Sequence, residues 1–174
     1  MPMYDIEHIV PLTDAQQDKI AEAITKIHSE KFVTARLFVN VNFKDISTMN
    51  TYVAGKRRPN NRIFANVRHG PSRTQEMYDA LCADIESLWA EVVGSEGKQE
   101  LRGVFVLGSI VAGSEGGFSV PKAGQDEEWL EKNVLAFKKK ADSGDTDFQG
   151  LLEDLRSRAV FNGILDRAGV NGAN

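Results

Sequence analysis

The chain opens with the stretch MPMYDIEHIV, residues 1–10, and the rest of the fold is organised around it. Residues 3–10 are rich in apolar side chains and stop at Pro11, which is typical of a β-strand. Pro2 follows the initiator methionine directly, a context in which that methionine is readily removed. Removal would leave a secondary amine, a base that titrates near about 8 in ordinary surroundings. If Met1 stays, the Pro2 nitrogen is an amide and cannot act as a base.

Composition limits the class of protein. The 174 residues are 41% hydrophobic and 26% charged, the range of a globular domain with a sizeable core. A net charge of -4 argues against general nucleic-acid binding, and the single cysteine, Cys82, excludes an intrachain disulfide. No apolar run reaches membrane-spanning length and no signal peptide is visible, so we expect a cytoplasmic protein without a membrane partner.

The first two thirds of the chain predict the same strand–helix–strand unit twice. The expected elements are strand 3–10, helix 13–29, strand 36–43, strand 62–67, helix 72–94 and strand 103–110. Thr13 with Gln16, and Ser72 with Gln75, have the spacing of capping boxes. The last strand is nearly continuous in apolar residues and is expected to be buried on both faces. We therefore predict an α/β (α+β) fold in which two consecutive βαβ units share a four-stranded mixed sheet.

The remaining segments are expected to decorate this core. Residues 44–61 form a polar loop, with a short hairpin as an option, and its basic end 56–58 is either a solvated tip or a lid that steers anions. Helices are predicted from Asp126 and across 148–160, with a frayed end at 168–174. We treat residues 1–174 as a single domain, with a core of 2–120 and a helical extension of 121–174.

Three side chains outside the N-terminus are candidates for chemistry. Arg73 is predicted in the first turn of the second helix, where a cation is unfavourable unless it binds an anion, and Arg68 could close on the same anion. The alternative for Arg73 is a solvated side chain or a salt bridge. His28 is expected at the end of the first helix, and Glu115 in a glycine-rich loop. With one cysteine and no paired histidine spacing, no metal site is expected.

Together these residues resemble the tautomerase superfamily, and most of all its cis-3-chloroacrylic acid dehalogenase-like branch with the longer fungal homologues. The resemblance spans about residues 2–130. It is most specific in the segments 23–28 and 34–43, in Arg73, and in Glu115 followed by Pro121 and Trp129.

The resemblance implies roles for individual residues. Pro2 would be the catalytic acid or base, His28 and Glu115 would handle a water molecule, and an arginine pair would hold the substrate carboxylate. Arg73 matches one arginine of that pair. The other falls at Gly70, so Arg68 would have to substitute from nearby. The remaining residues expected to contact substrate are Thr34, Phe38 and Phe105.

Phe105 departs from the family pattern. It replaces a tyrosine that assists water addition, and phenylalanine cannot donate a hydrogen bond. The resemblance also implies a homotrimer that needs neither a metal nor an organic cofactor.

The expected activity is therefore acid–base catalysis by Pro2 on small 2-oxo or unsaturated carboxylic acids. A neutral Pro2 favours keto–enol tautomerisation, and a protonated Pro2 favours hydration or dehalogenation. The lost tyrosine favours tautomerisation. Two alternatives remain: a non-catalytic trimeric binding protein on the same scaffold, and a ferredoxin-like regulatory domain with an antiparallel sheet.

Overall fold

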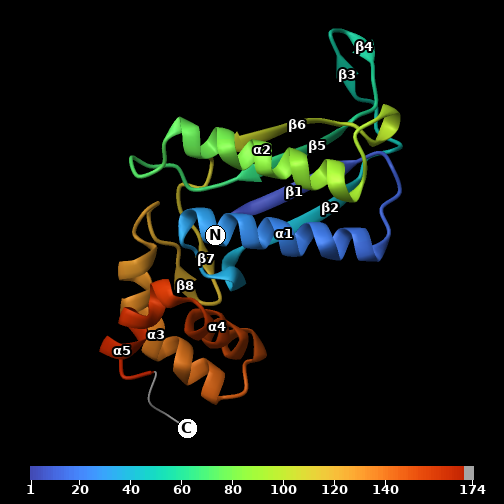
Figure 1. Cartoon of the computed structure of the whole chain (residues 1–174). Coiled ribbons are helices and arrows are strands. Elements are labelled where there is room, and N and C mark those ends of the chain that lie inside the picture. The colour runs from blue at the N-terminus through green and yellow to red at the C-terminus, as the bar shows by residue number, and fades with distance from the viewer. Residues whose placement is uncertain (171–174) are drawn as a thin grey trace.

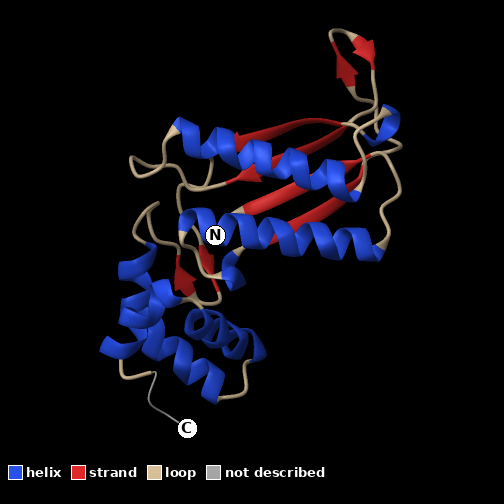
Figure 2. Ribbon diagram, viewed as in Figure 1, coloured by secondary structure: helices blue, strands red, loops and turns tan. Residues whose placement is uncertain are grey.

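The computed structural model describes residues 1–170 as a sheet covered by two helices, with a helical lobe at one end (Figure 1). Figure 2 shows the helices packed on one face of the sheet. The strands of the sheet are β1 (Met3–His8), β2 (Asn40–Asp45), β5 (Asn61–Asn66) and β6 (Leu101–Leu107). The covering helices are α1 (Asp14–Phe32) and α2 (Gln75–Val92).

The sheet has the order β2-β1-β5-β6. β1 pairs with β2 in parallel and β5 pairs with β6 in parallel, while the two halves meet through an antiparallel β1–β5 pair. The mixed sheet built from two βαβ units is therefore confirmed. Parallel pairing within each half contradicts the ferredoxin-like alternative.

The main core lies between the sheet and its two helices. Tyr4 and Ile6 of β1 are fully buried there, packed in one cluster with Ile24 of α1 and Leu81 of α2. On the opposite face of the sheet no helix from residues 1–170 covers the strands (Figure 1), and Met3, Phe105 and Leu107 are each more than 40% exposed. The prediction that the last strand is buried on both faces is wrong. β6 is an edge strand with one open face.

Several predicted boundaries moved because tertiary contacts override local pattern. The capping box at Thr13 is present, but α1 continues to Phe32, so His28 lies one turn inside the helix instead of at its end. The second predicted capping box does not form. Thr74 caps α2, and Arg73 therefore precedes the helix instead of lying in its first turn.

The segment predicted as strand 36–43 divides in two. Its first residues form the 3-10 helix η1 (Arg36–Phe38), and β2 begins at Asn40. Asp154 accepts a hydrogen bond from the Arg36 backbone N–H at 2.9 Å, and Phe38 packs into the C-terminal lobe. The contacts of this lobe thus delay the start of the strand to Asn40.

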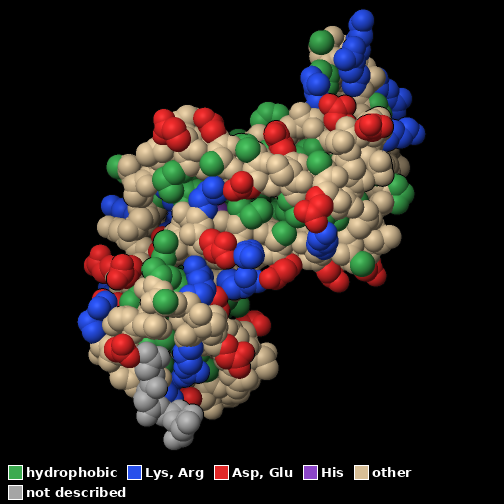
Figure 3. Space-filling view, viewed as in Figure 1, with side chains coloured by type: hydrophobic (Ala, Val, Ile, Leu, Met, Phe, Trp, Pro, Cys, Tyr) green, Lys and Arg blue, Asp and Glu red, His purple; other side chains and the backbone are tan. Residues whose placement is uncertain are grey.

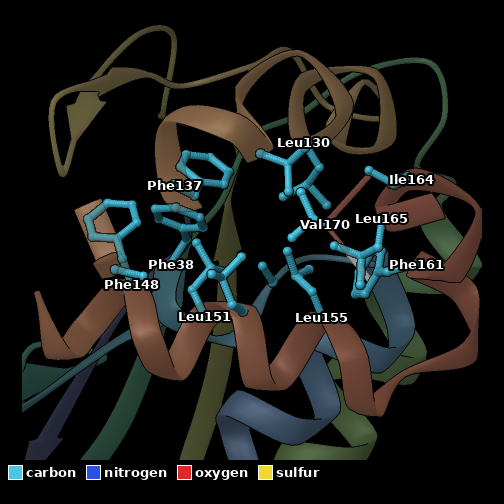
Figure 4. Close-up of a cluster of buried hydrophobic side chains, with 14 of the residues drawn as sticks. Phe38, Leu130, Phe137, Phe148, Leu151, Leu155, Phe161, Ile164, Leu165 and Val170 are labelled. Carbon is cyan, nitrogen blue, oxygen red and sulfur yellow. The ribbon is translucent and has the colours of Figure 1, made fainter. Parts of the chain in front are cut away.

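The C-terminal lobe has its own apolar core (Figure 4). It consists of α3 (Asp126–Asp142), α4 (Thr146–Ser157), the 3-10 helix η3 (Ala159–Phe161) and α5 (Asn162–Arg167), of which α5 was not predicted. Met1 and Phe38 of the first βαβ unit belong to the same cluster. The lobe therefore packs against the end of the sheet at which the chain starts.

Residues 168–170 differ from the predicted frayed end. The backbone N–H groups of Ala168, Gly169 and Val170 donate to the carbonyls of Ile164, Asp166 and Leu165, and the Val170 side chain is buried, so the prediction of fraying is wrong for these residues. The rest of that prediction, residues 171–174, lies outside the described part of the chain.

Two short hairpins complete the fold. β3 (Tyr52–Val53) and β4 (Lys56–Arg57) form the optional hairpin of the long loop, and Lys and Arg side chains gather at its tip (Figure 3). The hairpin extends from the end of the sheet opposite the N-terminus (Figure 1), about 20 Å away along a six-residue strand. A lid over the N-terminal site of the same protomer is therefore excluded. The second hairpin, β7 (Ser114–Glu115) with β8 (Phe118–Ser119), lies beside the C-terminal lobe (Figure 1).

No helix within residues 1–170 is both long and apolar enough to span a membrane.

Candidate active site

The N-terminal amino group lies in the interior, between the sheet and the C-terminal lobe. Met1 is 6% exposed, and the Asn40 backbone N–H donates to the Pro2 carbonyl at 3.1 Å, which fixes the start of β1. Burial, assisted by the positive charge of Arg68, lowers the pKa of this amine from 8.0 to about 5. Asp126 and Glu115 act in the opposite direction, and Arg73 lowers the pKa further. An amine in these surroundings is neutral at pH 7.

His28 is the nearest candidate for a hydrogen-bond donor to a substrate. Its Nδ1 lies 2.7 Å from the Tyr4 hydroxyl, and its Nε2 is buried without a partner among the described residues. Burial, followed by the charges of Arg73, the N-terminus and Arg68, holds the pKa of His28 well below its usual value, so the ring is neutral. The Tyr4 hydroxyl has no other acceptor within residues 1–170, so it donates to Nδ1. The proton of the neutral ring is therefore on Nε2, a buried donor without a partner among residues 1–170.

Arg73 carries a second unpartnered group. Its guanidinium lies over the Phe32 ring at 4.2 Å, and Nη1 donates to the Arg68 carbonyl at 3.3 Å. Nη2 is buried and has no partner in the part of the chain that the structure describes. A buried guanidinium nitrogen with a free N–H is strongly unfavourable in water-free surroundings, and an anion relieves this cost. Arg73 therefore has a buried N–H group that can donate to an anion, although the residue precedes the helix instead of opening it.

Arg68 is already committed to other partners. Nη2 donates to Asp126 Oδ1 at 2.6 Å, and Nη1 donates to the carbonyls of Pro121 and Lys122 at 3.0 and 3.2 Å. This buried ion pair ties the loop after β5 to the first residue of α3. The geometry therefore favours Arg73 over Arg68 as the ligand of a substrate carboxylate.

Glu115 reaches the same region from the β7–β8 hairpin. The two residues of its turn, Gly116 and Gly117, have φ values of 60° and 90°, a conformation that glycine adopts without strain. Asn40 Nδ2 donates to Glu115 Oε1 at 2.9 Å. Both residues line a cavity of about 480 Å³ together with Met1. The N-terminus, Glu115 and solvent therefore meet in one opening.

The three other residues that were expected to contact substrate lie in different parts of the structure. Phe38 is buried in the apolar cluster that includes Met1, with its ring 5.2 Å from that of Trp129. Thr34 is buried in the turn after α1, where its carbonyl accepts a hydrogen bond from Arg158. Phe105 is on the open face of the sheet, with its ring stacked on Phe64. The structure does not bring Phe105 to the N-terminus of its own protomer.

Three residues of the site were missed by sequence reasoning. Tyr4 and Asn40 were expected only as residues of strands, and Asp126 only as the start of a helix. Because each acts through a partner more than 20 positions away, no local pattern identifies them. Within residues 1–170 no group of three or more metal-ligating side chains is present.

The comparisons with known proteins agree with this geometry. Residues 1–134 match the model of the family Tautomerase_3, described as "Putative oxalocrotonate tautomerase enzyme", and the chain therefore belongs to this family of the tautomerase superfamily. No curated protein matches the chain.

Solved structures share the fold. N1, a member of the cis-3-chloroacrylic acid dehalogenase family, superposes with a TM-score of 0.62 at 24% identity, over 86% of this chain and 99% of its own. Pt0534 inactivated by 2-oxo-3-pentynoate gives 0.54 at 21% identity, over 67% and 94%. The Q0 fused 4-OT symmetric trimer gives 0.55 at 15% identity, over 70% and 98%. The tautomerase fold is thereby confirmed.

Proposed function

We propose that the protein is a Pro2-dependent acid–base enzyme that catalyses keto–enol tautomerisation of small 2-oxo carboxylic acids. One observation carries this proposal: the start of the chain is buried within electrostatic range of His28 and Arg73, and each of these residues has a buried nitrogen without a partner among residues 1–170. Removal of Met1 would transfer the free amine to Pro2. It would also vacate the space that the Met1 side chain fills beside Phe38, next to the new amine. A substrate side chain can occupy that space.

In the proposed mechanism Pro2 moves one proton from the carbon next to the carbonyl group to the 2-oxo oxygen. Arg73 binds the substrate carboxylate, and His28 Nε2–H donates to the 2-oxo oxygen. The neutral Pro2 amine takes the proton from the adjacent carbon, so that a C–H bond breaks and an N–H bond forms. The enolate charge collects on the oxygen that His28 holds. The ammonium of Pro2 then returns the proton to that oxygen, which gives the enol and regenerates the amine.

Two observations favour tautomerisation over hydration or dehalogenation. A hydratase of this type needs a protonated Pro2, whereas burial and Arg68 lower the pKa of the Met1 amine, one residue away, and we expect the same surroundings to favour a neutral amine on Pro2. Activation of water by His28 needs a ring nitrogen with a free lone pair, but Nδ1 is occupied by Tyr4 and Nε2 carries the proton. Only Glu115 remains as a base for water, and Phe105 cannot replace the missing tyrosine hydroxyl.

The open face of the sheet supports assembly as a homotrimer. Met3, Phe105 and Leu107 expose apolar surface there, and apolar patches of this kind mark interaction sites. Several solved proteins with this fold are described as trimers. In such an assembly Phe105 would contact a neighbouring protomer and could reach that protomer's site.

The test is ketonisation of phenylenolpyruvate by protein whose first residue has been determined by intact-mass measurement. We expect turnover from chains that begin at Pro2, and none from chains that retain Met1. Replacement of Pro2 by alanine should abolish turnover, because the reaction requires the secondary amine in this position. Full activity of the Pro2→Ala variant would refute the proposal. A mature protein without activity on any 2-oxo or unsaturated acid would support the non-catalytic alternative.

A further inference from the structure

We propose that Asp126, a residue of the C-terminal lobe, belongs to the active site, where its oxygen Oδ2 accepts a hydrogen bond from the Pro2 ammonium. Arg68 would hold the other oxygen and so position the carboxylate. This inference rests on the proposed function and adds a residue that the two βαβ units do not contain.

The burial of Asp126 needs an explanation beyond the helix macrodipole. Three acids open α3, and Glu127 and Glu128 are exposed, where they interact with the helix N-terminus at little desolvation cost. Asp126 is only 8% exposed. Removing a carboxylate from water costs several kcal/mol unless both oxygens find partners. A residue needed only for the macrodipole would not be buried.

The partners of Asp126 are incomplete. Arg68 Nη2 donates to Oδ1 at 2.6 Å, but Oδ2 is buried and has no partner among residues 1–170. No backbone N–H group of the first turn of α3 supplies the missing donor to Oδ2, and the Trp129 N–H donates to the Gln125 carbonyl instead. Oδ2 is therefore an acceptor without a donor.

Two other buried atoms lack partners in the same region, and both are donors. These are His28 Nε2 from α1 and Arg73 Nη2 from the segment before α2. The charges of Asp126 and Arg73 act on the pKa of the N-terminal amine, and the charges of that amine and of Arg73 act on the pKa of His28, so these groups lie within electrostatic range of one another. The C-terminal lobe thus supplies the hydrogen-bond acceptor, Asp126 Oδ2, whereas the two hydrogen-bond donors come from the βαβ units.

The donor to Asp126 Oδ2 follows from comparing the groups present in the proposed complex. In the proposed complex the substrate carboxylate pairs with Arg73 and the 2-oxo oxygen pairs with His28, and neither of these substrate groups has a proton to donate. The amine gains an N–H when it takes the proton from carbon. This N–H is the donor that appears at the reacting centre, and Asp126 is the buried acceptor that lacks one.

Charged groups from several elements act on the pKa of the N-terminal amine. Arg68 and Arg73 lower its pKa from the segments before α2, while Asp126 of α3 and Glu115 of β7 raise it. His28 of α1 is neutral and contributes no charge. Asp126 therefore balances the arginines, so that the amine is a neutral base at rest but can still hold a proton.

The experiment measures the Pro2 amine directly by ¹⁵N NMR titration of full-length protein that begins at Pro2, together with the kcat–pH profile on phenylenolpyruvate. In Asp126→Asn we expect the amine pKa and the ascending limb of the profile to move to lower pH by about one unit. We also expect kcat to fall about tenfold. In Arg68→Gln the amine pKa should move to higher pH. Glu127→Gln, the exposed neighbour on the same helix turn, should change neither.

The amine pKa is expected to fall in Asp126→Asn and to rise in Arg68→Gln, and these opposite directions separate a role in the active site from a purely structural role. If Asp126 only anchors the lobe, Asp126→Asn and Arg68→Gln break the same ion pair and move the profile in the same direction, or not at all; either result overturns the inference. Should Asp126→Asn fail to fold, the double variant Asp126→Asn with Arg68→Gln is compared with Arg68→Gln alone, and the same downward shift is expected. The proposed function would stand if only this shift were missing, and it would fail if Pro2→Ala were active.

Discussion

Replacing Tyr4 with phenylalanine tests whether a single hydroxyl sets the state of His28. The bond between the Tyr4 hydroxyl and His28 Nδ1 is 2.7 Å long and entirely buried. In Tyr4→Phe, Nδ1 becomes a buried acceptor without a donor, which costs about 1–3 kcal/mol. For a chain of this size that corresponds to a fall in Tm of about 2–12 °C. Because the ring also loses its anchor, Nε2–H no longer points reliably into the site.

The expected fall in kcat of Tyr4→Phe lies between two limits. If the variant ring only divides between its two neutral tautomers, half of the molecules keep the donor and kcat falls about twofold. Complete loss of a donor to a developing oxyanion costs about 10²–10³ in kcat. We expect a value between these limits, about tenfold, with KM little changed because Arg73 still binds the carboxylate.

The assay combines enol ketonisation kinetics with ¹⁵N NMR of the histidine ring at pH 7. The wild type should show a neutral ring protonated at Nε2, and Tyr4→Phe should show a mixture of tautomers. Tyr78→Phe is the matched control, since it removes a tyrosine hydroxyl whose two contacts, to His69 and the Arg68 carbonyl, are both 3.4 Å long. A wild-type ring protonated at Nδ1, or an unchanged kcat in Tyr4→Phe, would falsify the assignment of His28 as a donor.

Three further predictions follow from the same structure. Arg73→Ala should raise KM about 10- to 100-fold, the equivalent of one charge-assisted hydrogen bond, whereas Arg57→Ala on the distant hairpin should leave KM unchanged. Because the pKa of the N-terminal amine is lowered to about 5 and that of His28 is also lowered, the unfolded chain binds more protons than the folded one between pH 8 and pH 5. The free energy of unfolding should therefore fall as the pH drops through this window, and denaturant titrations at both pH values would measure it; equal values would contradict the burial of both groups. Leu151→Ala, in the core of the C-terminal lobe, should cost about 2–5 kcal/mol in the same titrations, and a cost below 1 kcal/mol would show that the lobe core is loosely packed.

Local pattern was sufficient for most of the fold. The capping box at Thr13 and the apolar stretch before Pro11 are signals within a few positions, and the structure has the helix and the strand that they predict. The resemblance to the tautomerase superfamily likewise depends on short segments and single residues. Element order, the two βαβ units and the identity of His28, Arg73 and Glu115 as candidates could therefore be read before any coordinates.

The errors arose where distant segments compete with local pattern. The last strand was expected to be buried on both faces because its residues are apolar, but burial depends on what covers a strand, and β6 is an uncovered edge. η1 replaced the start of a predicted strand because Asp154, 118 positions later, holds Arg36. Neither the open face of β6 nor the contact with Asp154 can be predicted from the neighbouring residues in the sequence.

The sequence by itself determined which elements form, in what order, and which residue types are available for acid–base chemistry, because hydrophobic period, caps and turn residues act over a few positions. Only the tertiary structure decided how those residues behave. Tyr4 sets the proton of His28 from 24 positions away, and Asp126 occupies Arg68 from 58 positions away. Burial and charge at a site are sums over all the chain segments that meet there, and these sums exist only once the chain has folded.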